Sequence, residues 1–248
     1  MGYAIDRKWS MTTKRFSASS AAQLIACPGS ANLDLAIPGW TPPVVDEEKG
    51  AKGKGHRLHE YLDGTSALTA KDLRALANSL IYMAELRSRR RFKVLTEQTI
   101  EATWLQTKPT TTVDVVLSTQ DELHIVDYKT GIIPVSPINN EQLMFYALSF
   151  SDLAPKAKGA HLHIVQPWVP DGMNEWYVSA TELRDFALLA QSAEQKIING
   201  DLSLHPSDHC KFCPAYPHSR GDKGRPFCPP ALRLLYPQPV DIDEILAL

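Results

Sequence analysis

Hydrophobic residues recur at helical spacing through the first third of the chain. Either Ser17 or Ser19 can cap a first helix, because a serine side chain accepts a hydrogen bond from the free backbone amides of the first turn. Two adjacent prolines then predict a loop over 38–45. Apolar positions three and four residues apart predict two further helices, over about 47–62 and 70–90.

After Leu95 the pattern changes to alternating and β-branched residues, which is typical of strands. We expect strands near 95–106, 111–118 and 122–128. A helix is predicted near 139–150, then strands near 160–166 and 174–179, then a helix from Thr181 to about Ile198. This order of elements indicates an α/β fold with a mixed central sheet flanked by helices.

Three segments are expected along the chain. Residues 1–15 form a loose leader, and residues 16–205 form the core domain with N-terminal helical elements. Residues 206–248 form a tail that is loop-like, because eight of the 18 prolines fall there. Three of the four cysteines lie in the same tail.

Composition is that of a soluble globular protein, with 44% hydrophobic and 22% charged residues. The formal net charge of -2 gives no support to nucleic-acid binding, and the basic run from Arg87 to Lys93 fits the solvated end of a helix equally well. No signal peptide is recognisable, and no apolar run approaches the roughly 18 residues of a membrane span. A cytoplasmic location without membrane contact is therefore expected.

The segment from Thr111 to Lys129 predicts a β-hairpin with a short polar loop. If the loop is symmetric about Gln120 and Asp121, Ser118 faces Leu123, and counting back along both strands places Asp114 opposite Asp127. Directly opposed residues share a sheet face, with Cβ atoms about 4.5–5.5 Å apart. Side chains alternate along a strand, so Lys129 shares the face of Asp127 and Tyr128 points away.

Two acids and a lysine on one face suit the hydrolysis of phosphodiesters. Carboxylates this close repel each other unless a cation lies between them. Such a cation lowers the pKa of a bound water, and the lysine can orient that water or neutralise developing charge. An exposed hairpin face with a Lys–Asp ion pair explains this segment equally well.

Four motifs occur in order along the chain. They are Gly55 to His59 as Gly-x-x-x-His, Asp114, Asp127-Tyr128-Lys129 as Asp-x-Lys, and Gln142 to Tyr146 as Gln-x-x-x-Tyr. This ordered set resembles that of the RecB-like nucleases of the PD-(D/E)XK superfamily, over roughly residues 17–230. Gln142 and Tyr146 are four apart, so they share a face of their helix.

The resemblance implies a restriction-endonuclease-like fold and a divalent-metal-dependent deoxyribonuclease. Mg²⁺ or Mn²⁺ would be held by His59, Asp114, Asp127 and the main-chain carbonyl of Tyr128. Lys129 would be the catalytic lysine, and Gln142 and Tyr146 would line the site and contact DNA. Taken alone, a helical histidine such as His59 is more often a surface or packing residue.

The cysteines are Cys27, Cys210, Cys213 and Cys228. Cys210-Lys-Phe-Cys213 is a chelating pair, because two intervening residues let both thiolates reach one metal. One early and three late cysteines resemble the iron–sulfur-clasped branch of the family: the AddB nuclease domain, CRISPR-associated exonucleases and phage-encoded relatives. There a 4Fe–4S cluster ties the N-terminal segment to the C-terminal tail. The gap from Cys213 to Cys228 is longer than the family pattern. The alternatives are Zn²⁺, with His209 or His218 as further ligands, and cysteines that bind no metal.

The resemblance further implies an exonuclease acting on single strands or duplex ends, in DNA recombination, repair or phage DNA processing, in a bacterial or phage-infected cell. The chain lacks the Gly-x-x-x-x-Gly-Lys-Ser/Thr loop of helicase motors, so a helicase or a single-strand annealing protein is an expected partner. Two alternatives are a non-catalytic DNA-binding or assembly protein with this fold, and a zinc-ribbon interaction module.

Overall fold

The computed structural model describes residues 16–41, 70–216 and 227–235. The chain forms two compact units. The first unit comprises residues 1–16, 20–44 and 190–248, and the second comprises 17–19 and 45–189. The boundary between them falls within the long helix α6 (Ala180–Ile198).

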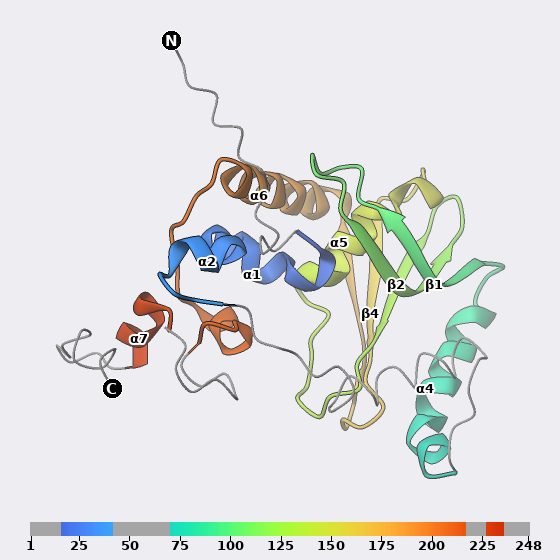
Figure 1. The fold of residues 1–248 in the computed structure, drawn as a ribbon. Coiled ribbons are helices and arrows are strands. Elements are labelled where there is room, and N and C mark those ends of the chain that lie inside the picture. The colour runs from blue at the N-terminus through green and yellow to red at the C-terminus, as the bar shows by residue number, and fades with distance from the viewer. Residues whose placement is uncertain (1–15, 42–69, 217–226, 236–248) are drawn as a thin grey trace. The chain divides into compact units, whose positions relative to one another are not determined.

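The second unit is built on a five-stranded sheet, in the spatial order β1-β2-β3-β4-β5 (Figure 1). The strands are β1 (Lys93–Glu101), β2 (Thr110–Ser118), β3 (Leu123–Tyr128), β4 (Gly159–Val165) and β5 (Met173–Ser179). Neighbours are antiparallel except β3 and β4, which run parallel. The predicted mixed central sheet of an α/β protein is therefore confirmed.

The hairpin between β2 and β3 has the predicted register. Ser118 pairs with Leu123 and Val115 with Val126, so the turn is symmetric about Gln120 and Asp121. The Thr119 amide donates to the Glu122 carbonyl at 2.9 Å, and the Glu122 amide donates to Thr119 Oγ1 at 3.0 Å. Because these bonds fix the turn, they also fix which side chains of the two strands share a face.

The parallel pair β3 and β4 is joined through α5 (Glu141–Ser149) and a short 3-10 turn, η3 (Ser151–Leu153). Asn140 caps α5, because its side chain accepts a hydrogen bond from the Leu143 amide at 3.2 Å. Parallel pairing brings the carboxyl ends of β3 and β4 to the same edge of the sheet.

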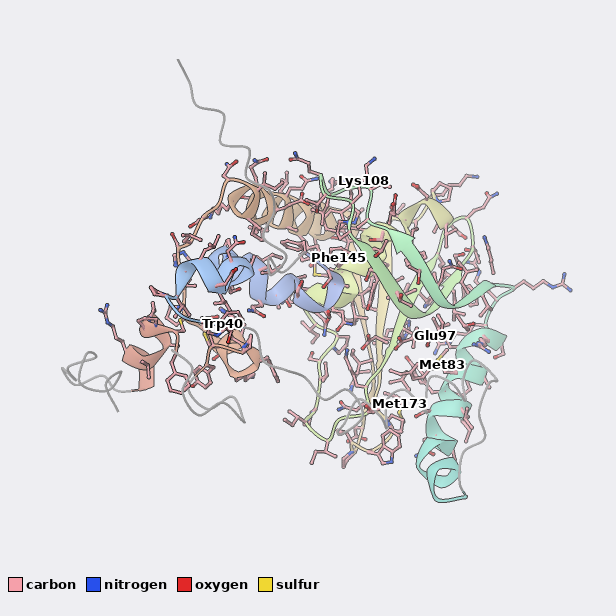
Figure 2. All side chains as sticks on the ribbon, in the orientation of Figure 1. Trp40, Met83, Glu97, Lys108, Phe145 and Met173 are labelled. Carbon is pink, nitrogen blue, oxygen red and sulfur yellow. The ribbon has the colours of Figure 1, made fainter. Side chains whose placement is uncertain are left out.

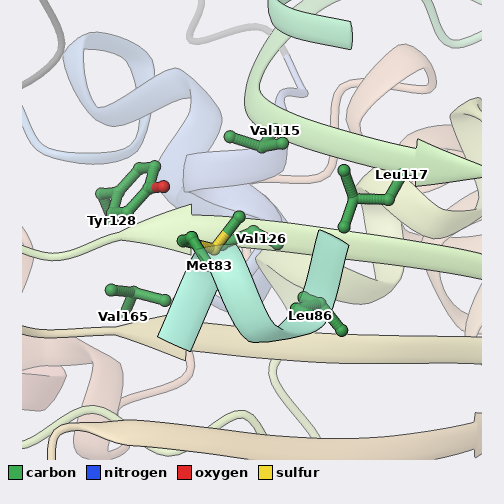
Figure 3. Close-up of a cluster of buried hydrophobic side chains, with 7 residues drawn as sticks. All are labelled: Met83, Leu86, Val115, Leu117, Val126, Tyr128 and Val165. Carbon is green, nitrogen blue, oxygen red and sulfur yellow. The ribbon is translucent and has the colours of Figure 1, made fainter. Parts of the chain in front are cut away.

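One face of the sheet packs against α4 (Ala70–Ser88). Met83 and Leu86 on α4 meet apolar side chains of three strands, as Figure 3 shows: Val115, Leu117, Val126, Tyr128 and Val165. On the opposite face α5 contacts β3 and β4. Its fully buried Phe145 packs edge-on against Trp104, with ring centroids 4.9 Å apart (Figure 2).

Three histidines line up across β3 and β4 on the face covered by α4. His163 is fully buried, and its Nδ1 lies 2.7 Å from the Tyr82 hydroxyl on α4. Its Nε2 lies 3.0 Å from Nδ1 of His124, whose ring stacks on that of His161. Burial lowers the pKa of His124 to about 4 and that of His163 to about 3, and nearby histidines add to the shift. Both rings are therefore neutral in the folded protein at neutral pH.

The first unit contains short helices around a small core. They are α1 (Ala21–Ala26), η2 (Pro28–Asn32), α2 (Leu33–Ala36), η4 (Asp208–Phe212) and α7 (Pro229–Leu235). The 3-10 turn η1 (Ala18–Ser20) precedes α1, at the point in the sequence where the division between the units falls. Leu33, Ile37 and Trp40 pack with Ala231 and with two of the cysteines. Gly29 is required in this core, since a Cβ there would lie 2.3 Å from the Ser203 carbonyl oxygen.

Three predictions about elements are wrong. The first helix is not capped by Ser17 or Ser19: a 3-10 turn precedes it, and Ser20 occupies the cap position without a side-chain hydrogen bond. The strand predicted over 95–106 ends at Glu101, because hydrogen-bonded turns begin at Ala102. The tail beyond residue 205 contains η4 and α7, since prolines are tolerated in the first turn of a helix.

The helix predicted over 70–90 corresponds to α4, and the one predicted near 139–150 corresponds to α5. The helix predicted over 47–62 lies outside the described residues. In the part of the chain that is described, no helix is both long enough and apolar enough to cross a membrane.

Candidate active site and cysteine cluster

Asp127 and Lys129 lie at the carboxyl end of β3 and point to the face of α5. The Asp127 side chain is buried, and its Oδ2 lies 2.7 Å from Lys129 Nζ. A quarter of the lysine side chain is exposed, 26%, so the ammonium group can still be reached from solvent. A buried carboxylate needs a neighbouring positive charge, which Lys129 supplies.

Gln142, in the first turn of α5, connects both charged groups. Its Oε1 accepts a hydrogen bond from Lys129 Nζ at 2.9 Å, and its Nε2 donates to Asp127 Oδ1 at 3.2 Å. The amide therefore offers its acceptor to the cation and its donor to the anion, which fixes the lysine over the end of the strand.

Tyr146 lies one helical turn after Gln142, as the spacing of four residues predicts. Gln142 Nε2 donates to the Tyr146 hydroxyl at 2.9 Å. Burial raises the pKa of Tyr146, and the nearby charge of Asp127 raises it further. The hydroxyl is therefore neutral and keeps its proton. Thr111 at the start of β2 acts in the opposite direction and lowers the pKa of the same hydroxyl; no sequence pattern distinguishes this threonine.

Asp114 on β2 reaches the backbone of β3. Its Oδ2 accepts a hydrogen bond from the Tyr128 amide at 2.6 Å. The last paired residues are Val115 and Val126, so Asp114 and Asp127 occupy the next position of the same register. The Tyr128 side chain points to the α4 face, where burial raises its pKa (Figure 3).

Glu97 on β1 occupies the register position opposite Asp114, between the pairs Thr96–Val115 and Gln98–Val113. Figure 2 labels this residue. Its φ of 46° is uncommon for a residue other than glycine, and its pairing with β2 is missing there although β1 itself continues. The negative charges of Asp114 and Glu97 both raise the pKa of Tyr128. A third carboxylate therefore lies near the end of the hairpin.

The donor chemistry of this site suits a hard divalent cation. Asp114 and Asp127 supply carboxylate oxygens from adjacent strands, which Mg²⁺ and Mn²⁺ prefer. Within residues 16–41, 70–216 and 227–235, however, no group of three or more His, Cys, Asp or Glu side chains is arranged to hold a metal ion. His59, the expected third ligand, lies outside the described residues.

The four cysteines are brought together in the first unit. Each is a free, buried thiol, and all four line one pocket. They lie at the ends of short elements: Cys27 after α1, Cys210 within η4, Cys213 after η4, and Cys228 before α7. Residues far apart in sequence thus share one small site.

Hydrogen-bond donors point at three of the sulfur atoms. The His205 amide lies 3.2 Å from Cys27 Sγ, and the Ser207 amide lies 3.3 Å from Cys210 Sγ. The side-chain amide of Gln23 donates to Cys213 Sγ at 3.7 Å. Burial raises the pKa of Cys213 to about 11 and also raises that of Cys228. Without a positive charge in the pocket, these two thiols stay protonated.

The second unit thus combines a mixed sheet with a cluster of an aspartate, a lysine and a glutamine amide at the end of β3. Its sequence matches the family described as "Protein of unknown function (DUF2800)" over residues 69–224, more than half of the chain. The protein is a member of that family.

Several solved structures resemble the chain at low sequence identity. A candidate exonuclease from Eubacterium rectale is 10% identical, with 95% of this chain and 98% of that chain covered and a TM-score of 0.49. The alkaline exonuclease LHK-Exo from Laribacter hongkongensis is 10% identical, with 76% and 93% covered and a TM-score of 0.32. A phage-related exonuclease from Haemophilus somnus 129PT is 14% identical, with 76% and 96% covered and a TM-score of 0.35. At these scores the likeness does not establish a shared fold.

Proposed function

We propose that this protein is a divalent-metal-dependent deoxyribonuclease with a RecB-like PD-(D/E)XK active site. The observation that carries the proposal is the contact of Lys129 with both Asp127 and Gln142 at the end of β3. An exposed hairpin face with an incidental ion pair would not bury the carboxylate or add an amide that bridges both charges. An exonuclease acting on DNA ends is the form of the activity that the motif order favours.

Asp114 and Asp127 would hold Mg²⁺ or Mn²⁺, together with His59 and the Tyr128 carbonyl. The bound cation would lower the pKa of a water ligand and stabilise negative charge on the phosphate. The hydrogen bond from the Tyr128 amide to Asp114 Oδ2 orients that carboxylate.

Lys129 would act on the water that attacks phosphorus. Its ammonium group is held between Asp127 and Gln142, so it can orient this water and offset charge that develops on the phosphate oxygens. Gln142 positions the lysine, and the neutral hydroxyl of Tyr146 supports Gln142. Gln142 and Tyr146 would also meet the DNA strand.

The test is a substitution series on end-labelled DNA in the presence of Mg²⁺ or Mn²⁺. Asp114→Ala, Asp127→Ala and Lys129→Ala should each lower cleavage about 100-fold or more, because each removes a proposed ligand or the lysine. Asp121→Ala is the matched control, since this exposed acid lies in the loop of the same hairpin. Near-normal cleavage by all three variants would contradict the proposed centre.

A non-catalytic DNA-binding or assembly protein is the alternative. That function would not need Asp114, Asp127 and Lys129 to occupy one site. It predicts DNA binding without cleavage under any metal, and the same substitution series then leaves binding unchanged.

For the cysteine pocket we propose a 4Fe–4S cluster held by Cys27, Cys210, Cys213 and Cys228. Four buried thiols line the pocket, and amide donors point at sulfur, which is a feature that tunes iron–sulfur centres. Zinc remains the alternative, with His209 as a further ligand beside Cys210.

A further inference from the structure

Two largely exposed isoleucines follow the candidate catalytic lysine in the sequence. Ile132 is 81% exposed and Ile133 is 71% exposed, and Pro134 beside them is exposed as well. They lie in the loop between β3 and α5. Exposing two large aliphatic side chains does not stabilise the folded chain, because burying each one would be favourable. Their exposure therefore points to a role outside folding.

The backbone of this loop is held rigidly by one buried side chain. Gln166, only 1% exposed, donates from Nε2 to the carbonyls of Gly131 and Ile133, both at 2.8 Å. Its Oε1 accepts from the Val135 amide at 3.0 Å. The carbonyls on both sides of Ile132 are thus held in place, so this backbone cannot move towards the protein without breaking part-buried hydrogen bonds.

The anchor itself belongs to a closed turn after β4. The Gln166 amide donates to the Gly172 carbonyl at 2.7 Å, and the Val169 amide donates to the Gln166 carbonyl at 3.2 Å. A Cβ at Gly172 would lie 2.1 Å from the Gln166 carbonyl oxygen, so only glycine fits. The same turn displays Trp168, which is 37% exposed. Both loops lie at the carboxyl edge of the parallel pair, beside the candidate site.

The two isoleucines lie close to the candidate site on the scale of a DNA duplex. Ile132 is three residues after Lys129, so their Cα atoms lie within about 11 Å of each other. Duplex DNA rises about 3.4 Å per base pair. The distance from Lys129 to Ile132 therefore corresponds to at most about three base pairs of duplex DNA. If a phosphate binds at Lys129, Ile132 can reach a base step that close to it.

We propose that Ile132 and Ile133 form a wedge that unstacks duplex DNA beside the scissile phosphate. This inference rests on the proposed nuclease function and names its substrate as a duplex end that must be opened. Apolar side chains, namely Phe, Leu, Ile, Met and Pro, are the ones that proteins insert between base steps. Platforms that stack single-stranded bases use aromatic rings instead, so the Ile-Ile-Pro sequence favours a wedge.

The test compares cleavage of a blunt duplex with cleavage of the corresponding single strand. The double variant Ile132→Ser/Ile133→Ser should lower the duplex-to-single-strand rate ratio about tenfold or more, because unstacking a base step costs a few kcal/mol without the wedge. Ile81→Ser is the matched control, since Ile81 is 55% exposed on α4 and should leave the ratio unchanged.

A second readout does not depend on cleavage. In the Lys129→Ala background, binding of a duplex with 2-aminopurine at its terminal step should raise the fluorescence, and the double isoleucine variant should abolish that rise. An unchanged rate ratio together with an unchanged fluorescence rise would overturn the wedge. So would a double variant whose only effect is a changed oligomeric state, because the isoleucines would then cover a second copy of the chain. Absence of any cleavage by the wild-type protein would instead overturn the proposed function.

Discussion

At the scale of single residues, the candidate site depends on one amide that serves two charges. Gln142 accepts from Lys129 and donates to Asp127, so both its orientation and its chemistry matter. The residues beside Gln142 on α5 cannot take over this bridging role. Glu141 has no amide group that can donate, and Leu143 is apolar and buried in the core. We therefore assign Gln142 a positioning role.

Gln142→Ala should lower DNA cleavage by about 10- to 100-fold, the usual effect of removing a residue that orients a metal or catalytic group. Lys129 would lose its hydrogen bond to Oε1 while its contact with Asp127 persists. The measurement is the cleavage rate at saturating metal and its metal dependence. Gln195→Ala on the exposed face of α6 is the control. Equal rates for Gln142→Ala and the control would remove Gln142 from the site.

At the scale of elements, the α4 face of the sheet combines an apolar cluster with buried histidines. Leu86 is 1% exposed within this cluster, whereas Leu80, on the same helix, is 37% exposed. Leu86→Ala should lower the free energy of unfolding by about 2–5 kcal/mol, since it leaves a cavity against β2 and β3. Leu80→Ala should cost about 0.5 kcal/mol or less. Urea denaturation of both variants checks this, and equal losses would contradict the packing.

Two buried histidines on β3 and β4 make the stability of this face of the sheet sensitive to acid. The pKa values of His124 and His163 lie at about 4 and about 3 in the folded protein, below the ordinary value of 6.5. As the pH falls below 6.5 the unfolded chain binds protons that the folded chain does not. Stability is therefore fully present above pH 6.5 and is lost as the pH falls towards about 4 for His124 and about 3 for His163.

Each of the two histidines can contribute up to about 1.4 kcal/mol per pH unit to this loss. The measurement is the free energy of unfolding at pH 7 and at pH 5. His163→Gln removes one titrating ring, so the difference between the two pH values should shrink relative to wild type. A variant with the same difference as wild type would show that His163 is not the source.

Much of this organisation could be predicted from the sequence, because it rests on local periodicity. The hairpin register follows from a symmetric polar turn, and the shared face of Gln142 and Tyr146 follows from a spacing of four. Other features depend on pairing between distant segments. His124 meets His163 only because β3 and β4 run parallel, and the hold of Gln166 on Gly131 needs the same pairing.

Sequence patterns did not predict the local backbone structure where a residue type occurs in more than one kind of structure. Pro229 and Pro230 resemble the end of ordered structure, yet they begin α7, because the first turn of a helix needs no amide donor there. Glu97 lies in an alternating strand pattern and within β1, but its φ of 46° coincides with a missing pair opposite Asp114. A pattern of residue types does not encode that backbone conformation.

At the scale of the whole chain, the proposed cluster closes a loop between Cys27 and the tail. Binding a metal group there contributes to folding directly, because the pocket does not exist in the unfolded chain. Protein purified without oxygen should contain iron and labile sulfide. Cys27→Ser should lower both, together with solubility, although Cys27 is remote in sequence from the other three ligands.

His209→Ala separates the two metal assignments. It should leave the iron content unchanged if four thiolates are the ligands, although His209 Nε2 lies 3.7 Å from Cys210 Sγ. Elemental analysis of the purified variants is the measurement. Colourless protein with stoichiometric zinc, and Cys27→Ser indistinguishable from wild type, would contradict the iron–sulfur assignment. The nuclease proposal is independent of that result.

The central claim is that the end of β3 hydrolyses DNA with the help of a divalent cation. The most direct measurement is digestion of end-labelled DNA by wild type and by Lys129→Met, with Mg²⁺ or Mn²⁺ and again with excess chelator. Wild type should cleave only when the metal is present. Lys129→Met keeps an unbranched side chain one atom shorter than lysine but removes its charge, and it should be at least about 100-fold slower. Cleavage that survives chelation, or equal rates for the two proteins, would contradict the claim.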